Sequence, residues 1–254
     1  MDVKVGLVSD IGKKRSINED NLLVEKKLGI FMVADGMGGH AAGDLASTIA
    51  VETVHKFLEK HLSNQKIRLP FLVDEDFGFE GNVIIQALYT ANQKIFEKAK
   101  KSENFKDMGT TAVLMLLKED VLFISHVGDS RAYLFREEHL HQLTEDHSWV
   151  NEQLRLNQIT PLEAKTHKWK NVIMRALGSK ETVKVDINAY YLQENDIVLA
   201  TTDGLTDIVP NSKIAAIIKQ KGDDVQKCSE ELLQAALENG GKDNITIILL
   251  KVVG

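Results

Sequence analysis

Short hydrophobic runs separated by polar turns recur along the chain and predict a protein built largely of strands. The runs lie at residues 3–9, 20–26, 29–35, 110–117, 121–127, 131–135, 139–143, 183–192, 196–202 and 244–252. The connections 118–120 and 136–138 are too short for a crossover, so the strands on either side of each should form an antiparallel hairpin.

Four other segments repeat their apolar residues at helical spacing: 41–62, 81–100, 211–221 and 224–239. Gly222 follows the third segment, and Asp223 or Asp224 precedes the fourth as a cap. Because the strands come in hairpins and the helices in two pairs, the pattern predicts an α+β fold. We expect an αββα sandwich, in which two antiparallel sheets are flanked by helix pairs.

The segment 145–180 breaks this pattern. It is irregular and polar, and it contains both tryptophans of the chain. We expect an insertion that lies over one end of the sandwich. No repeat, linker or low-complexity segment divides the chain, so residues 1–254 are expected to form a single domain.

Charge and cysteine content narrow the functional classes. The formal net charge is -6, whereas a nucleic-acid groove needs positive charge. Cys228 is the only cysteine, so no intrachain disulfide can form, as is usual in a reducing compartment. The N-terminus lacks a signal-peptide pattern, and the longest C-terminal apolar run, 245–250, is far shorter than the roughly 20 residues that span a bilayer. We expect a cytoplasmic protein with no membrane insertion.

Aspartates stand at the boundaries of four apolar runs. Asp35, Asp129 and Asp203 each follow one, and Asp243 precedes the last. A single Asp-Gly is usually only a turn. If these strand ends meet, however, four carboxylates repel one another and need cations to offset the repulsion. Oxygen ligands suit magnesium or manganese better than zinc or copper.

The histidines offer a weaker metal site. His139 and His141 would share one strand face, but they lie in a polar hairpin beside Glu137 and Glu138. We therefore do not expect them to bind a metal.

Residues 36–41 match the dinucleotide-binding pattern G-x-G-x-x-A. Asp35 would then place a carboxylate beside a pyrophosphate, and the flanking elements are not β-α-β units. Gly38 to Gly43 has P-loop spacing, but Asp44 stands where lysine is required. We therefore expect these glycines to allow close backbone approach to a cation and its phosphate.

A series of short motifs runs almost from end to end of the chain: Arg15–Asp20, Val33–His40, Gly109–Ala112, Val127–Tyr133, Leu143–Ser148, Thr202–Leu205 and Lys242–Asn244. In this order they resemble the metal-dependent protein serine/threonine phosphatases of the type 2C class, in their compact bacterial form. The resemblance implies the same αββα sandwich that the element pattern predicts.

The resemblance also implies a binuclear metal centre with Mn²⁺ or Mg²⁺. Asp35 would bridge the two cations, and Asp203 and Asp243 would complete the first site. The carbonyl of Gly36 would serve the second. The two ions would lower the pKa of a bridging water, which attacks phosphorus in line while the serine or threonine oxygen leaves.

Further residues receive roles in the same way. Asp129, together with Asp203, would hold a third and weaker ion, and Glu19 and Asp20 would hold metal-bound waters. Arg15 would grip the substrate phosphate, because its planar fork suits bidentate contact with phosphate oxygens.

The chain departs from many eukaryotic relatives at Met37, where they have a histidine that is the favoured general acid. His40, three residues on, is a candidate general acid or a supporting residue, and a metal-bound water is the alternative.

The segment 145–180 matches the family's variable flap beside the active site. Its residues His147, Trp149, Trp169 and Arg175 are candidates for substrate contact; the alternative is that the tryptophans anchor the flap and the charged residues face water.

The expected function is hydrolysis of phosphoserine and phosphothreonine in proteins. The resemblance to bacterial members suggests that the enzyme counteracts a membrane-anchored serine/threonine kinase and acts on its substrates. One alternative is a catalytically weak scaffold, which the retained carboxylates disfavour. Another is a phosphatase for a small phosphorylated metabolite. We expect a monomer.

Overall fold

Two antiparallel sheets stack face to face in the computed structural model, which describes residues 1–38, 41–64, 66–71 and 75–254. The first sheet has the order β1 (Asp2–Asp10), β11 (Ile245–Val253), β10 (Ile197–Thr201), β7 (Arg131–Arg136), β8 (His139–Gln142). The second has the order β2 (Asp20–Glu25), β3 (Ile30–Met37), β5 (Ala112–Lys118), β6 (Val121–Val127), β9 (Asp186–Tyr191), and β4 (Gly109–Thr110) also pairs with β3. Both predicted hairpins, β5–β6 and β7–β8, are confirmed.

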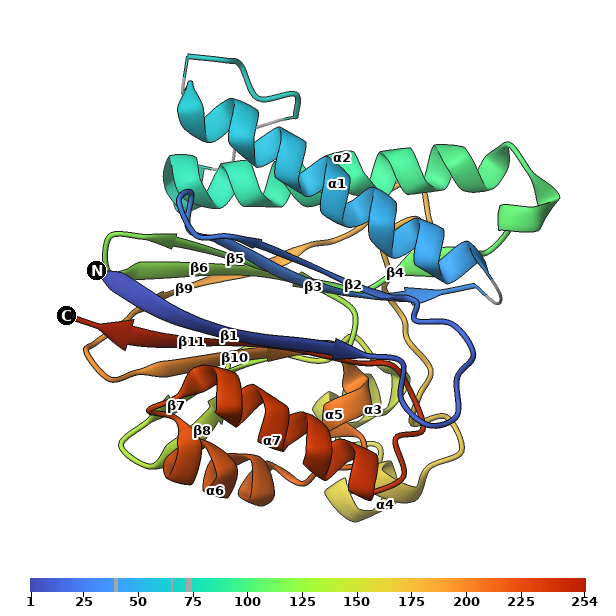
Figure 1. Ribbon diagram of the computed structural model, residues 1–254. Helices are drawn as coiled ribbons and strands as arrows, with labels where there is room; N and C mark the ends of the chain where they lie inside the picture. The colour runs from blue at the N-terminus through green and yellow to red at the C-terminus, as the bar shows by residue number, and fades with distance from the viewer. Residues whose placement is uncertain (39–40, 65, 72–74) are drawn as a thin grey trace.

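A helix pair covers each outer face, which confirms the αββα sandwich (Figure 1). Helices α1 (Ala41–Ser63) and α2 (Gly78–Lys100) lie over the second sheet. Helices α6 (Asn211–Lys221) and α7 (Val225–Glu238) lie over the first. Asp224 caps α7, since its side chain accepts a hydrogen bond from the Lys227 amide.

Burial on both faces explains why the apolar runs are nearly continuous. On β3, Ile30 and Met32 pack with the helix pair, whereas Phe31 and Val33 pack between the sheets. All four side chains are fully buried. Burying each one stabilises the fold by roughly 1.5–3 kcal/mol.

Several boundaries differ from the prediction. Strand β3 runs on to Met37, so Asp35 lies inside a strand and not after it. The strand predicted at 183–192 begins only at Asp186, because its partner β6 ends at Val127 and Asp186 already pairs with His126. Two short 3-10 helices (Glu75–Phe77 and Glu103–Phe105) flank α2, which begins at Gly78 and not at 81.

The insertion 145–180 is also more regular than predicted. It contains α3 (Trp149–Arg155) and α4 (Pro161–Thr166), and a further short helix, α5 (Asp203–Thr206), follows β10. Local capping explains α4: Thr160 and Glu163 form a reciprocal capping box, and Pro161 occupies the first helical position. In the part of the chain that the structure describes, no helix is long and apolar enough to span a membrane.

Candidate metal centre

The predicted acidic residues come together from distant parts of the chain. Asp20 on β2 is the direct cross-strand partner of Asp35 on β3. Asp203 begins α5, and Asp243 stands just before β11. Repulsion from Asp203, Asp20, Asp129 and Asp243 acts on the Asp35 carboxylate, so these side chains share one site.

The cluster is costly to ionise. Burial, followed by repulsion from neighbouring carboxylates, holds the pKa of Asp35 well above its usual range. Burial also raises the pKa of Asp20, Asp129 and Asp203. The site therefore stores electrostatic repulsion that a bound cation would offset.

Hydrogen bonding leaves part of this cluster unsatisfied. Within the described residues, four buried carboxylate oxygens lack a hydrogen-bond partner: Glu19 Oε1, Asp20 Oδ1, Asp129 Oδ1 and Asp203 Oδ1. Buried polar atoms without partners are rare in native proteins and call for a reason. A hard divalent cation and its waters would supply that reason, because such ions take oxygen ligands. The residues present fit a Mg²⁺ or Mn²⁺ centre.

Two threonines fix the backbone of Asp35. The Thr111 amide and the Thr110 hydroxyl each donate to the Asp35 carbonyl oxygen, at 2.8 Å in both cases. The Asp35 amide donates to Thr111 Oγ1 at 3.0 Å. The motif Gly109–Ala112 thus orients the central carboxylate from the neighbouring strand.

Gly36 lies in a crowded part of the site. A Cβ atom at this position would stand 2.1 Å from the Gly43 carbonyl oxygen, so only glycine fits. The Gly36 amide donates to the Glu19 carbonyl at 3.1 Å. This contact holds the loop that carries Glu19 against β3. His40, the candidate general acid, lies outside the described residues.

Asn244 holds the N-terminal loop to the site. Its Oδ1 accepts a hydrogen bond from the Glu19 amide at 2.8 Å, and its Nδ2 donates to the carbonyls of Ile11 and Ile17, both at 3.0 Å. Asn244 belongs to the motif Lys242–Asn244. Only the structure, however, shows that its side-chain amide binds both ends of the loop that carries Arg15.

Arg15 reaches the acidic cluster from that loop. Its Nη2 lies 2.7 Å from Asp243 Oδ2, and both side chains are partly exposed. Hydrogen bonding to Asp243, with attraction to Glu19 and Asp35, raises the Arg15 pKa. The structure therefore brings Arg15 to the predicted site, but pairs it with a predicted metal ligand.

A second cluster of possible ligand atoms lies on β6, β9 and the base of the insertion. Ligand atoms of His126, His147 and Asp186 all lie within 4.8 Å of one another and by position could hold a metal ion. Arg175 Nη1, however, stands 3.0 Å from Asp186 Oδ1 and 3.0 Å from His147 Nε2. A fixed guanidinium charge at that point disfavours a cation, so the aspartate cluster is the better metal site.

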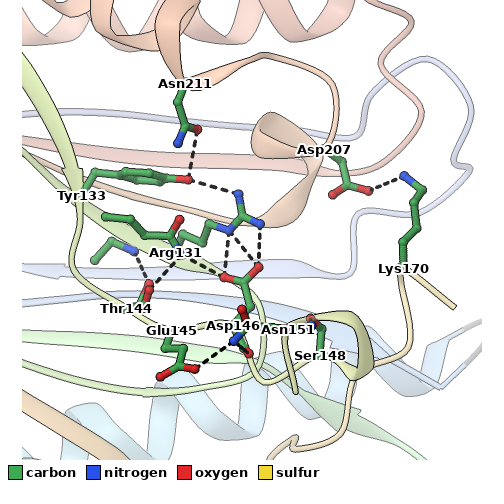
Figure 2. A network of polar contacts seen from close by, with 12 residues as sticks. Arg131, Tyr133, Thr144, Glu145, Asp146, Ser148, Asn151, Lys170, Asp207 and Asn211 are labelled. Atoms are coloured by element: carbon green, nitrogen blue, oxygen red, sulfur yellow. Dashed lines mark hydrogen bonds and ion pairs between the residues drawn. The ribbon is translucent and has the colours of Figure 1, made fainter. Parts of the chain in front are cut away.

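The insertion is anchored beside the aspartate cluster, and Figure 2 shows the contacts. Arg131 binds Asp146 through Nε and Nη2 and also donates to the Tyr133 hydroxyl. Lys170 Nζ lies 3.6 Å from Asp207 Oδ2 on the core of the fold. The base and the far part of the insertion thus contact residues close in sequence to Asp129 and Asp203.

The two tryptophans of the insertion, Trp149 and Trp169, form an aromatic group together with His167. Trp149 stacks on His167 with ring centroids 4.5 Å apart, and Trp169 meets Trp149 edge-on at 4.7 Å. This packing favours anchoring as the role of Trp149. Trp169 remains 44% exposed and keeps surface for other contacts.

Known proteins share this sequence and this fold. The profile of the family described as Protein phosphatase 2C matches residues 11–245. Protein phosphatase PhpP of Streptococcus pneumoniae is 35% identical over 253 residues, which cover 98% of this chain and 98% of that protein.

Solved structures agree with this similarity. The serine/threonine phosphatase PstP/Ppp of Mycobacterium tuberculosis superposes with a TM-score of 0.87 at 30% identity, covering 100% of both chains. The catalytic domain of the serine threonine protein phosphatase PstP, solved in complex with 2 manganese ions, gives a TM-score of 0.84 at 29% identity over 99% of each chain.

Proposed function

The chain belongs to the protein phosphatase 2C family, and we propose that it hydrolyses phosphoserine and phosphothreonine in proteins with two divalent cations that its aspartate cluster would hold. It is a serine/threonine protein phosphatase, as its relatives are named. The four buried, unpartnered carboxylate oxygens around Asp35 carry the proposal for the metal centre.

Within this proposal, Asp35 would help to hold both cations, because it lies at the centre of the cluster and is repelled by the other aspartates. Asp203 and Asp243 would help to hold one cation, and the Gly36 carbonyl would serve the other. Asp129, together with Asp203, would hold a third ion.

The buried residues at the rim would hold waters. Asp20 has one oxygen fixed by the Thr202 hydroxyl at 2.8 Å, which leaves the other to accept from a metal-bound water. Glu19 presents a buried, unpartnered oxygen in the same way.

Bound cations would supply Lewis acidity, which lowers the pKa of water and neutralises charge on the phosphoryl group. The protein's own part is positioning. The Asp35 backbone is locked at both its amide and its carbonyl, so its carboxylate stays in place during the reaction. Arg15 would turn from Asp243 to the substrate phosphate, once Asp243 is engaged by a cation, and hold the phosphoryl oxygens in a bidentate grip.

Manganese is the ion we propose for assays, because a relative of similar fold was solved with 2 manganese ions. We propose phosphorylated proteins as substrates, including a membrane-anchored serine/threonine kinase and its targets. We also propose that the enzyme acts as a monomer and that residues 1–254 form one phosphatase domain. The apolar layer shared by both sheets supports the single domain.

The deciding experiment is phosphate release from a phosphothreonine peptide in Mn²⁺, in EDTA, and after Mn²⁺ is restored. Activity that requires Mn²⁺ supports the proposal. A folded, Mn²⁺-bound protein that hydrolyses small phosphate esters but no phosphopeptide would point to a metabolite phosphatase. One that hydrolyses neither would point to a scaffold.

Arg15→Ala is expected to raise KM for a phosphopeptide by about tenfold to a hundredfold, since a hydrogen bond to a charged group contributes about 1.5–3 kcal/mol. The KM of Arg15→Lys should lie between those of the wild type and Arg15→Ala, because lysine keeps the positive charge but cannot make the bidentate contact of a guanidinium group. Initial rates measured against peptide concentration give the result, with Lys14→Ala, an exposed neighbour, as control. An unchanged KM in Arg15→Ala would remove Arg15 from phosphate binding.

Mn²⁺ is expected to stabilise the fold more at about pH 8 than at about pH 5. Burial and repulsion raise the carboxyl pKa values, to about 8 for Asp129, from an ordinary value of 3.8. Below the raised values protons compete with the cation, and above them the ionised cluster is destabilised until the cation binds. At a hundredfold excess over Kd the gain should approach about 2.7 kcal/mol. Urea titrations with Mn²⁺ and with EDTA at each pH measure it, and equal gains at both would contradict the cluster as the binding site.

A further inference from the structure

Strand β1 has a free edge, because it lies at the end of the first sheet and its strand partner is β11 on one side. In an antiparallel strand, the main-chain groups of successive residues point alternately to the two sides. Leu7 uses both its amide and its carbonyl on a side chain of α7, so its groups point away from β11. The groups of Val3, Val5 and Ser9 point the same way. Outward groups of this kind can pair with a strand of another chain.

The side chain of Gln226, in the first turn of α7, occupies the middle of this edge. Its Oε1 accepts from the Leu7 amide at 3.1 Å, and its Nε2 donates to the Leu7 carbonyl at 3.2 Å. A carboxamide carries the same acceptor and donor as a main-chain peptide group. Gln226 therefore makes the two hydrogen bonds that a residue of a neighbouring antiparallel strand would make.

Two neighbours hold the Gln226 amide in this position. Glu230, one turn further along α7, accepts from Nε2 at 3.0 Å, which fixes the donor end of the amide. Gly6 allows the helix to approach the strand, because a Cβ atom there would stand 2.1 Å from the Val225 carbonyl oxygen. Figure 1 shows α7 lying along β1, against which it packs. The first turn of α7 is thus kept at the edge of the sheet.

The rest of the edge suits a second copy of β1. Among the described residues, no hydrogen bond reaches the outward groups of Val5. In the antiparallel register centred on Leu7, Lys4 of each copy would stand opposite Asp10 of the other, and such opposite charges attract. The same register needs the amide and carbonyl of Leu7 in both copies. Gln226 already binds these two groups.

We propose that Gln226 acts as a substitute strand partner, which closes the free edge of β1 and keeps it from pairing with β1 of a second copy of this chain. The inference goes beyond the proposed function and does not depend on it, because β1 carries no residue of the aspartate cluster. It also gives a physical reason why the chain would stay a monomer.

Gln226→Met tests the closure, because methionine has a similar size and helix propensity but lacks the amide donor and acceptor. We expect its dimer association constant to be at least about tenfold above that of the wild type, since neither copy has to break two hydrogen bonds before it pairs. Sedimentation equilibrium over a range of protein concentrations measures this constant. Gln234→Met is the matched control, because Gln234 is exposed on the same helix and donates to Glu238, four residues on. It should associate no more than the wild type.

A second substitution tests the register of the pairing. Gln226→Met/Lys4→Glu should return to the monomer, because the new carboxylate would stand opposite Asp10 of the other copy. Lys4 is exposed, so its replacement leaves the core intact.

Amide hydrogen exchange, followed by NMR in dilute wild-type protein, gives a readout that needs no variant. The Leu7 amide should exchange more slowly than the Val5 amide, although both point outward, because only Leu7 has an acceptor. Gln226→Met should remove this difference in dilute protein. In concentrated protein it should slow the exchange of both amides, as a second strand covers them.

Four outcomes would overturn the proposal: equal exchange of Leu7 and Val5 in the wild type, a Gln226→Met protein that stays monomeric, a Gln234→Met protein that dimerises equally, or a dimer that Lys4→Glu does not reverse. None of them bears on the proposed function, which Mn²⁺-dependent phosphate release decides separately.

Discussion

Asp35→Asn is expected to lower kcat by about 10³-fold or more, because even groups that only support metal ligands cost about 10–100-fold when removed. The substitution keeps the size of the side chain and its backbone hydrogen bonds to Thr110 and Thr111. It removes the charge at the centre of the cluster. Asp203→Asn should behave similarly, since its carboxylate is the neighbour that repels Asp35 most strongly.

Steady-state hydrolysis of a phosphopeptide and of p-nitrophenyl phosphate at saturating Mn²⁺ would measure the loss. Asp120→Asn is a matched control, because this exposed residue lies in the β5–β6 turn, at the opposite end of β5 from Thr111. The Asp35→Asn protein should also be at least as stable as the wild type in EDTA, since one repelling carboxylate is gone. Wild-type turnover in Asp35→Asn at saturating Mn²⁺ would rule out the aspartate cluster as the catalytic centre.

Asp146→Ala is expected to destabilise the fold by about 3 kcal/mol, because it leaves the Arg131 guanidinium mostly buried without its carboxylate. Arg131 donates to Asp146 Oδ1 at 2.8 Å and to Oδ2 at 3.1 and 2.5 Å (Figure 2). The Tyr133 hydroxyl, at 3.2 Å, is an uncharged acceptor and compensates only in part.

The double variant Arg131→Met/Asp146→Leu tests what the pair contributes. Replacing both partners by apolar residues of similar size should restore most of the lost stability, since it leaves no unpaired charge. Activity should be lower than in the wild type, because the double variant also lacks the Arg131–Asp146 contact between β7 and the base of the flap. Urea denaturation at fixed Mn²⁺ and pH, with phosphopeptide assays, measures both. A double variant as unstable as Asp146→Ala would mean that the pair itself stabilises the fold strongly.

The hydrophobic pattern predicted most of the sandwich, because a strand that is buried on both faces has a nearly continuous apolar sequence. The run 29–35 is such a case, and it became β3 between helices and sheet. Its end was wrong, since β3 continues to Met37. Polar residues at a strand end look like a turn in sequence, and only the pairing with Asp20 and with β4 shows that the strand goes on.

The short helices of the insertion were missed for a different reason. Thr160, Pro161 and Glu163 carry a complete helix-start signal, but the helix that follows has only 6 residues and one buried side chain. Hydrophobic periodicity cannot detect so short an element. A search for capping boxes would have found it.

The acidic residues of the candidate site could be named from strand boundaries and from the family motifs, and the structure brings them together. Their separate roles stay predictions. The sequence could not show that Arg15 pairs with Asp243, or that His147 binds Gly128. Such contacts depend on loops that approach only after the sheets pack, and no local pattern records them.

The place of β11 has a consequence for how the protein is made. This strand lies between β1 and β10, so the first sheet stays open until the segment 245–253 has left the ribosome. The proposed ligands likewise span Asp35 to Asp243, and Asn244 clasps the loop of Glu19. A nascent chain stalled before β11 would expose the edges of β1 and β10, and Asp243 and Asn244 would not yet be held in place beside the sheets. Phosphatase activity should therefore appear only after β11 is synthesised, which prevents partly made chains from acting on cellular phosphoproteins.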